Sequence, residues 1–356
     1  MSETVMSDTA QRQALAEELD SFNCRIAQPT DGPLFTREPQ STMQAAHWKA
    51  ADLARLLEKI GASIKLEAGG QRRTLRLANR GLPFGTTPTL WASIQYILPG
   101  EIATAHRHTA SALRFIMQGR GADTIVDGER YEMNEGDLVL TPAMAWHDHE
   151  HKGDKPMIWL DVLDISLVRS MHATFFEGSA TPRQAVLDIP DHSYRRYGSA
   201  IMRPLNDRNT PELNPLLVYP AARAQEALRL AAALPPDPFD DTALEYVNPL
   251  DGGPALPTIG TVLQSLRPGV HTQAHRHTGS VVYYVMRGKG ATVVNGTTFE
   301  WGAGDFMAIP PWAVHEHINR SDDTPAMLFQ VNDIPALRKL GLYREEAVDV
   351  AEAGRN

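Results

Sequence analysis

The sequence predicts an all-β protein made of two tandem β-barrels of the jelly-roll type, with helical flanks at its N-terminal and C-terminal ends. Short apolar runs that stop at glycine or proline predict many strands. A histidine-rich pattern also occurs twice, which predicts two homologous domains rather than a short-period repeat. The length of 356 residues suits two domains of ordinary size.

Composition excludes several classes of protein. The net charge of −9, from 34 basic and 43 acidic residues, makes a nucleic-acid partner a poor prospect. No run of 18 apolar residues is present, so we expect no membrane-spanning helix. The polar, acidic N-terminus is unlike a signal peptide and favours a cytoplasmic protein. The single cysteine, Cys24, excludes an intramolecular disulfide framework and a cysteine-based zinc site.

The repeat aligns two windows at an offset of 169 residues, which becomes 168 after one residue is lost in a hairpin. Ten of the 13 histidines lie in these windows, at 106–151 and 271–317. The matched pairs are His106/His275, His108/His277, Gly119/Gly288, Gly121/Gly290, Gly128/Gly296, Gly136/Gly304, Pro142/Pro310, His147/His315 and His149/His317.

Each window is typical of antiparallel strands. Ala112–Gln118 and Val281–Arg287 are apolar runs that end before glycine. Asp127-Gly128 and Asn295-Gly296 are strong signals for tight hairpin turns. Further short strands are predicted at 137–141 and 305–309, each stopped by a proline.

The flanks predict helices and divide the chain into four parts. Helical spacing of apolar residues predicts a helix over 41–61, alanine-rich composition predicts one over 221–234, and a closing helix is expected at 335–350. We therefore expect a helical segment (1–62), a first barrel with the catalytic metal site (63–190), a linker with a helix (191–241) and a second barrel (242–356).

The histidine spacing predicts a metal site in the first barrel. Residues two apart on a strand share a face, so His106 and His108 point inward together, and His147 returns after two hairpins as a third ligand. Three imidazoles without cysteine suit iron, zinc, copper or nickel, and packed histidines without a metal are the structural alternative. His275, His277 and His315 would form an equivalent second site, whose occupancy the sequence leaves open.

These motifs carry a family resemblance. The segments from Gly100 to Gly119 and from Gly136 to His147 resemble the two cupin motifs, and the segment from Gly304 to Asn319 resembles the second motif again. The chain therefore resembles a bicupin. Ala112 and Val281 stand where the first cupin motif usually has glutamate. A site of three histidines then keeps the full charge of a divalent ion, which favours an anionic, chelating substrate.

A narrower resemblance is carried by 71–79, 88–96, 106–115, 146–149 and 156–161, which are similar to gentisate 1,2-dioxygenase and its salicylate and 1-hydroxy-2-naphthoate dioxygenase relatives. It implies Fe(II), one ion per N-terminal cupin, and O2. It also implies cleavage of an aromatic ring between the carboxyl-bearing and the neighbouring hydroxylated carbon, so that gentisate gives maleylpyruvate. The expected partners are a small aromatic hydroxy acid and further copies of the chain, in a homo-oligomer that the resemblance implies to be a tetramer.

Strand parity places Arg114 on the inward face with His106 and His108, where it would bind a carboxylate and stabilise oxyanions. The resemblance adds a catalytic acid/base and contacts with the substrate. His149 would act near the metal on a substrate hydroxyl or on oxygen, and Asp161 would orient a ligand histidine. The remaining substrate-binding positions are Arg72, Arg73, Trp91, Gln95 and Trp159, with Gln95 also among the catalytic candidates.

Structural roles compete with these assignments. Arg72 and Arg73 face opposite ways and either would be a solvated charge, Trp91 and Trp159 would be core residues, and His149 would bond to a backbone carbonyl. The substrate also stays open, since the same chemistry would serve salicylate, substituted salicylates or 1-hydroxy-2-naphthoate, and Ser93 would constrain the size of the ring. A non-catalytic metal-binding bicupin is the alternative from a different class.

Overall fold

The computed structural model describes residues 8–26, 32–65, 73–210 and 213–349. The chain divides into two compact units, 1–40 and 41–356. The first unit contains one helix, α1 (Asp8–Ser21), and the second contains both barrels. None of the helices in the described ranges is long and apolar enough to cross a membrane.

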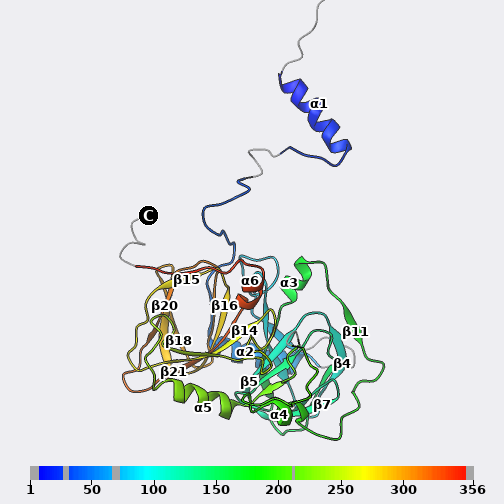
Figure 1. The fold of residues 1–356 in the computed structure, drawn as a ribbon, viewed down its shortest axis with the longest axis vertical. Helices are drawn as coiled ribbons and strands as arrows, with labels where there is room; N and C mark the ends of the chain where they lie inside the picture. The colour runs from blue at the N-terminus through cyan, green and yellow to red at the C-terminus, as the bar shows by residue number, and fades with distance from the viewer. Residues whose placement is uncertain (1–7, 27–31, 66–72, 211–212, 350–356) are drawn as a thin grey trace, which may run out of the picture. The chain divides into compact units, whose positions relative to one another are not determined.

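The first barrel consists of two antiparallel sheets, in agreement with the predicted fold class (Figure 1). Its six-stranded sheet has the order β12 (Val218–Tyr219), β8 (Leu138–Thr141), β5 (Ala112–Gln118), β10 (Met157–Leu163), β3 (Trp91–Ile97) and β2 (Thr74–Arg76). Its five-stranded sheet has the order β11 (Phe176–Gly178), β4 (Ile102–His108), β9 (His147–His151), β6 (Arg120–Val126) and β7 (Glu129–Asn134).

The second barrel repeats this arrangement. Its six-stranded sheet has the order β1 (Ala46–Trp48), β19 (Phe306–Ile309), β16 (Val281–Arg287), β21 (Ala326–Asn332), β14 (Gly260–Leu266) and β13 (Thr242–Glu245). Its five-stranded sheet has the order β18 (Thr297–Gly302), β17 (Lys289–Val294), β20 (His315–Asn319), β15 (His275–His277) and β22 (Glu345–Ala347). The predicted hairpins are confirmed, because Asp127-Gly128 and Asn295-Gly296 both have positive φ at both turn residues.

The barrels exchange edge strands. β1 precedes the first barrel in sequence but pairs with β19 of the second, and β12 precedes the second barrel but pairs with β8 of the first. The expected parts 1–62 and 191–241 therefore each contain a strand that completes a sheet of another part, β1 in the first case and β12 in the second. The strands lie outside the histidine windows, so the repeat gave no signal for the exchange.

Each exchanged strand is followed by a helix. The first N–H of that helix donates to an aspartate that directly precedes the strand with which the exchanged strand pairs. α2 (Ala50–Ser63) follows β1, and the Ala50 N–H donates to Asp305 at 2.8 Å. α5 (Ala221–Ala231) follows β12, and the Ala221 N–H donates to Asp137 at 2.8 Å. A carboxylate at this position satisfies a backbone donor that the helix leaves free.

The core is continuous between the two barrels. One cluster of buried residues includes Leu113 and Phe115 of the first barrel with Phe329 and Val331 of the second. The rings of Phe115 and Phe329 stack with centroids 3.9 Å apart. Burial of two large aromatic side chains at this junction joins the barrels through apolar surface.

Two predicted helices have different limits in the structure. The helix expected at 41–61 begins only at Ala50, because residues 46–48 extend to pair with β19. The prediction of a closing helix over 335–350 is correct only for its first residues and wrong for the rest. α6 (Ile334–Lys339) ends at Lys339, and the chain then forms β22 beside β15. The remaining helices are α3 (Ile165–Ser170) and α4 (His192–Tyr197).

Candidate metal centre and active site

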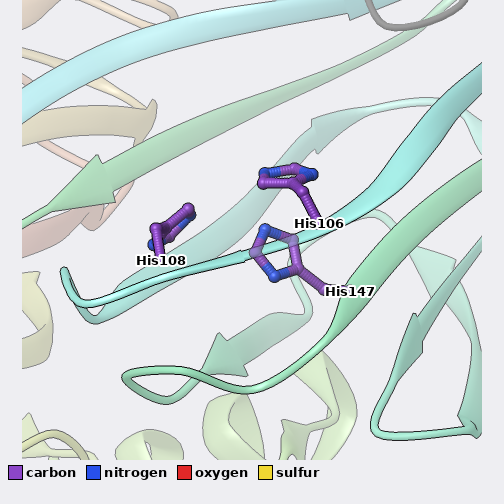
Figure 2. A group of neighbouring side chains, drawn as sticks. All are labelled: His106, His108 and His147. Atoms are coloured by element: carbon purple, nitrogen blue, oxygen red, sulfur yellow. The ribbon is translucent and has the colours of Figure 1, made fainter. Parts of the chain in front are cut away.

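Three histidines of the first barrel converge as the spacing predicted. His106 and His108 project from the same face of β4, and His147 begins the neighbouring strand β9, directly across from His106. One ring nitrogen from each residue lies within 4.8 Å of the others. Figure 2 shows the three rings turned toward a common point. The two strands therefore supply three imidazole ligands on a fixed backbone.

Backbone carbonyls orient all three rings. Nδ1 of His106, His108 and His147 lies 3.0, 2.8 and 3.0 Å from the carbonyl oxygens of Thr104, Ala110 and Ala145. An N–H at Nδ1 leaves the lone pair on Nε2, which is the form that binds a metal ion. The acceptors of these Nδ1 groups are thus carbonyls, rather than the Asp161 carboxylate that the sequence suggested.

A cavity of about 600 Å³ opens beside the triad. This volume lies in the range of small-molecule sites. The expected site residues in its wall are His106, His108, His147, Arg114, Trp91, Ser93, Gln95 and Asp161. The sequence analysis missed Thr74, which also lines the cavity.

Arg114 is a buried cation in the cavity wall. Its side chain is 4% exposed, its Nη1 donates to Thr141 Oγ1 at 2.5 Å, and its Nε lies 3.2 Å from Asp161 Oδ1. Burial lowers the pKa of Arg114, and the charge of Asp161 opposes that shift. One carboxylate directly across the sheet therefore compensates the guanidinium, since Arg114 and Asp161 face each other in the pairing of β5 with β10.

Gln95 and Trp91 lie on one face of β3. Gln95 is buried, and within the described part of the chain its Nε2 has no hydrogen-bond partner. A buried amide donor in a cavity wall is available to a ligand oxygen. Trp91 is held between the guanidinium of Arg76, 4.5 Å from its ring, and the ring of Phe84, at 4.7 Å. Cation–π contact and aromatic packing fix the Trp91 ring at the cavity.

The structure places Arg73 and Trp159 away from the cavity wall. Arg73 is fully buried and makes a bidentate ion pair with Glu101, with donor–acceptor distances of 2.7 and 2.6 Å. Its Nε donates to the carbonyl oxygen of Ile64. It is therefore a structural residue, because its donors are consumed inside the fold. Arg72 lies outside the described residues.

His149 and Trp159 pack together in the barrel interior. Their ring centroids are 5.4 Å apart, and His149 lies 6.2 Å from His147 by the same measure. Both side chains are fully buried and neither lines the cavity. Trp159 is thus a core residue, while a role for His149 has to act from behind His147.

Phe176 is a residue that sequence reasoning missed. It begins β11, lines the cavity and stacks on His106 with a centroid distance of 5.3 Å and an interplanar angle of 29°. β11 pairs with β4, so that Phe176 faces His108 and Gly178 faces His106. The segment lies outside the histidine windows, so only the register of the strand reveals it.

The second barrel contains a complete triad in a smaller cavity. One nitrogen each of His275, His277 and His315 lies within 4.8 Å of the others. The adjoining cavity is about 220 Å³, and Tyr283 occupies the position that Arg114 has in the first barrel. Burial lowers the pKa of His275 to about 4, and the charge of His277 adds to that shift. Burial lowers the pKa of His277 and His315 as well, so the three imidazoles are neutral at neutral pH.

Comparison with known proteins agrees with this geometry. The cupin domain family matches residues 93–163 and 262–332. The chain is 39% identical to 5-aminosalicylate 1,2-dioxygenase of Comamonas sp. over 94% of its own length and 90% of the relative's. It is 38% identical to gentisate 1,2-dioxygenase 1 of Aquipseudomonas alcaligenes over 95% and 96% of the two chains. The structure of salicylate 1,2-dioxygenase from Pseudoaminobacter salicylatoxidans with gentisate superimposes with a TM-score of 0.88 at 31% identity, covering 98% of this chain and 97% of that one.

Proposed function

The chain belongs to the gentisate 1,2-dioxygenase family of ring-cleaving bicupin enzymes, and on that basis we propose that its substrate is gentisate. In this proposal Fe(II) and O2 are used to open the ring between the carboxyl-bearing and the adjacent hydroxylated carbon. Both atoms of O2 enter the product, maleylpyruvate. The supporting observation is that an inward-facing triad of histidines and a buried arginine share one cavity.

The donor set of the first barrel fits ferrous iron. Three imidazoles on fixed strands, with each Nδ1 bonded to a carbonyl, present three Nε2 lone pairs at one place. Imidazole suits iron, and the absence of a protein carboxylate leaves the charge of the ion for an anionic substrate. His106, His108 and His147 would hold the ion, which when bound supplies the Lewis acidity and redox chemistry that ring cleavage by O2 requires.

Arg114 supplies the carboxylate recognition in this mechanism. Nη1 donates to Thr141, and Nε lies beside the carboxylate of Asp161. These two contacts fix the plane of the guanidinium. Its other donors meet the cavity, where a planar fork suits a carboxylate.

Gln95 and Trp91 orient the aromatic ring. The Gln95 Nε2 group donates a hydrogen bond to an oxygen of the substrate, and the Trp91 ring packs against its carbon skeleton. Phe176 adds apolar surface on the side of His106. His149 is buried beside His147, with ring centroids 6.2 Å apart, and would act on the substrate only through that ligand.

The named relatives act on 5-aminosalicylate, gentisate and 1-hydroxy-2-naphthoate, so a substrate panel is the decisive experiment. The protein is loaded with Fe(II) without air, and O2 uptake is measured with gentisate, 5-aminosalicylate, salicylate and 1-hydroxy-2-naphthoate. We expect one O2 per gentisate, and the highest kcat/KM for that substrate. A higher value for another acid reassigns the substrate, and no uptake with any of them supports a non-catalytic metal-binding bicupin. Light scattering of the same sample tests the expected tetramer.

A further inference from the structure

The C-terminal strand places a carboxylate beside the second triad. β22 pairs with β15 so that Glu345 faces His277, Glu346 faces Arg276 and Ala347 faces His275. Glu345 Oε1 lies 3.9 Å from Nδ1 of His275, and the Tyr343 hydroxyl donates to Glu345 Oε2 at 2.8 Å. The carboxylate is therefore held at the edge of the cavity that His275 and His277 line.

This strand occupies the place that β11 has in the first barrel. There, Phe176 faces His108, Glu177 faces Arg107 and Gly178 faces His106. Glu177 and Glu346 play the same part, since they accept hydrogen bonds from Arg107 and Arg276 at 2.7 and 2.6 Å. The two strands differ at their first residue, which is Phe176 in the first barrel and Glu345 in the second. A carboxylate therefore replaces the phenyl group beside the triad.

Nδ1 of His275 lacks an acceptor that its counterpart has. Nδ1 of His277 lies 2.9 Å from the carbonyl oxygen of Gly279, and Nδ1 of His315 lies 3.0 Å from that of Ala313. The three histidines of the first barrel make the same kind of contact with backbone carbonyls. His275 is 3% exposed, and within the described ranges its Nδ1 has no hydrogen-bond partner. The carboxylate of Glu345 lies beside that nitrogen, at 3.9 Å.

We propose that the second barrel is a divalent transition-metal site in which Glu345 accepts the Nδ1 hydrogen of His275 while the three Nε2 atoms bind the ion. Nε2 of His275 and Nε2 of His315 already lie 2.9 Å apart and face the same point. A carboxylate behind a ligand histidine orients the ring and makes it a stronger donor. Metal binding is thereby coupled to the docking of the C-terminal strand.

The ligand of this site is the metal ion and not an aromatic acid. Tyr283 stands where Arg114 would bind a carboxylate, and its hydroxyl lies 3.3 Å from His317. Asp240, Glu245 and Glu345 line the cavity, against Arg338 as the basic residue. Burial raises the pKa of Asp240 to about 7, so that carboxyl group is partly protonated at neutral pH. Glu245 and Glu345 still outnumber Arg338, which favours a cation and opposes an anionic substrate.

Metal titration tests the proposal without measuring turnover. Co(II) is added to metal-free protein, bound metal is counted, and hydrogen exchange is followed in 343–348. We expect two ions per wild-type chain, and one ion for either His108→Ala or His277→Ala. Co(II) should slow exchange of 343–348 in the wild type and in His108→Ala, but not in His277→Ala.

Glu345→Gln separates the role of the carboxylate from the fold of the strand, and Glu346→Gln on the same strand is its matched control. Glu345→Gln should weaken the second site by about 10- to 100-fold, as loss of such a partner usually does. Glu346→Gln should lower that affinity much less, because its side chain pairs with Arg276 and not with a ligand histidine. One ion per wild-type chain, with no effect of His277→Ala, would overturn the metal site, and equal affinities of the two glutamine variants would overturn the role of Glu345.

Discussion

Arg114 is the residue on which substrate recognition and stability both depend. Its guanidinium is buried, and Asp161 is the carboxylate that faces it. Removing one member of a buried ion pair leaves the other charge uncompensated, which costs about 3–5 kcal/mol. Recognition of an anionic substrate is therefore built on an internal ion pair.

Arg114→Met should destabilise the protein by about 3 kcal/mol and raise KM for the acid by about tenfold or more. Iron content should stay the same, because the three histidines are untouched. The double variant Arg114→Met/Asp161→Asn should recover most of the stability but none of the affinity. Urea unfolding, metal analysis and steady-state kinetics check the three statements, and loss of iron in Arg114→Met would contradict a role in substrate binding alone.

Replacing Gln95 should lower activity without lowering stability, whereas replacing Arg114 should lower both. Its Nε2 is a buried donor that has no partner among the described residues. Replacing it with methionine removes an unsatisfied polar group, worth about 1–3 kcal/mol. We expect Gln95→Met to be as stable as the wild type or more so, while kcat/KM falls. A variant that loses stability without losing activity would show that Gln95 is a structural residue.

At the scale of elements, two equivalent aspartates cap two equivalent helices in different surroundings. Burial by itself would raise the pKa of Asp305, but hydrogen bonds from the Ala50 N–H, His47, the Gly302 N–H and Lys49 together lower it. For Asp137 burial dominates the hydrogen bonds from Ala221 and Asn134, and its pKa is raised. The capping contact is the same, so the difference lies in the balance between burial, which prevails at Asp137, and the hydrogen bonds, which prevail at Asp305.

This difference predicts opposite dependences on pH. A lowered carboxyl pKa gives stability that is present above the unfolded pKa and lost as the pH falls through the folded pKa, and a raised pKa has the opposite sign. Asp305→Asn should therefore cost about 1 kcal/mol more than Asp137→Asn at pH 7. The gap should begin to narrow as the pH falls through the raised pKa of Asp137, and it should close below about 4, the usual pKa of aspartate, as Asp305 is protonated. Urea unfolding of both variants between pH 3 and 7 measures it, and a gap that widens in acid would refute the assignment.

At the scale of the whole molecule, the two barrels share one apolar core across their junction. Phe115 and Phe329 stack within a cluster to which both barrels contribute. A core that is continuous across two repeats makes their unfolding cooperative, because neither repeat can lose structure without exposing surface of the other.

Phe329→Ala should therefore destabilise both barrels together. Truncating a buried phenylalanine costs about 3–5 kcal/mol. Hydrogen exchange in denaturant should show that strands of the first and the second barrel lose protection in one transition, at a lower urea concentration than in the wild type. Selective loss of protection in the second barrel would show that the barrels are independent domains.

The sequence predicted the parts of this molecule that depend on local spacing. His-x-His on a strand, Asp-Gly and Asn-Gly turns and the parity of Arg114 need only neighbouring residues, and the structure brings the triad and Arg114 to one cavity. Strand exchange, the burial of Arg73 against Glu101 and the position of Phe176 depend on contacts between distant segments. A single sequence carries no periodic signal for such contacts.

The exchange of edge strands makes the two halves of the gene product interdependent. A cut between residues 190 and 191 would leave the N-terminal fragment without β12 and with β1 lacking its sheet. Each fragment would then present an open sheet edge, which is a template for aggregation. Co-expressed fragments would complement each other by restoring both pairings.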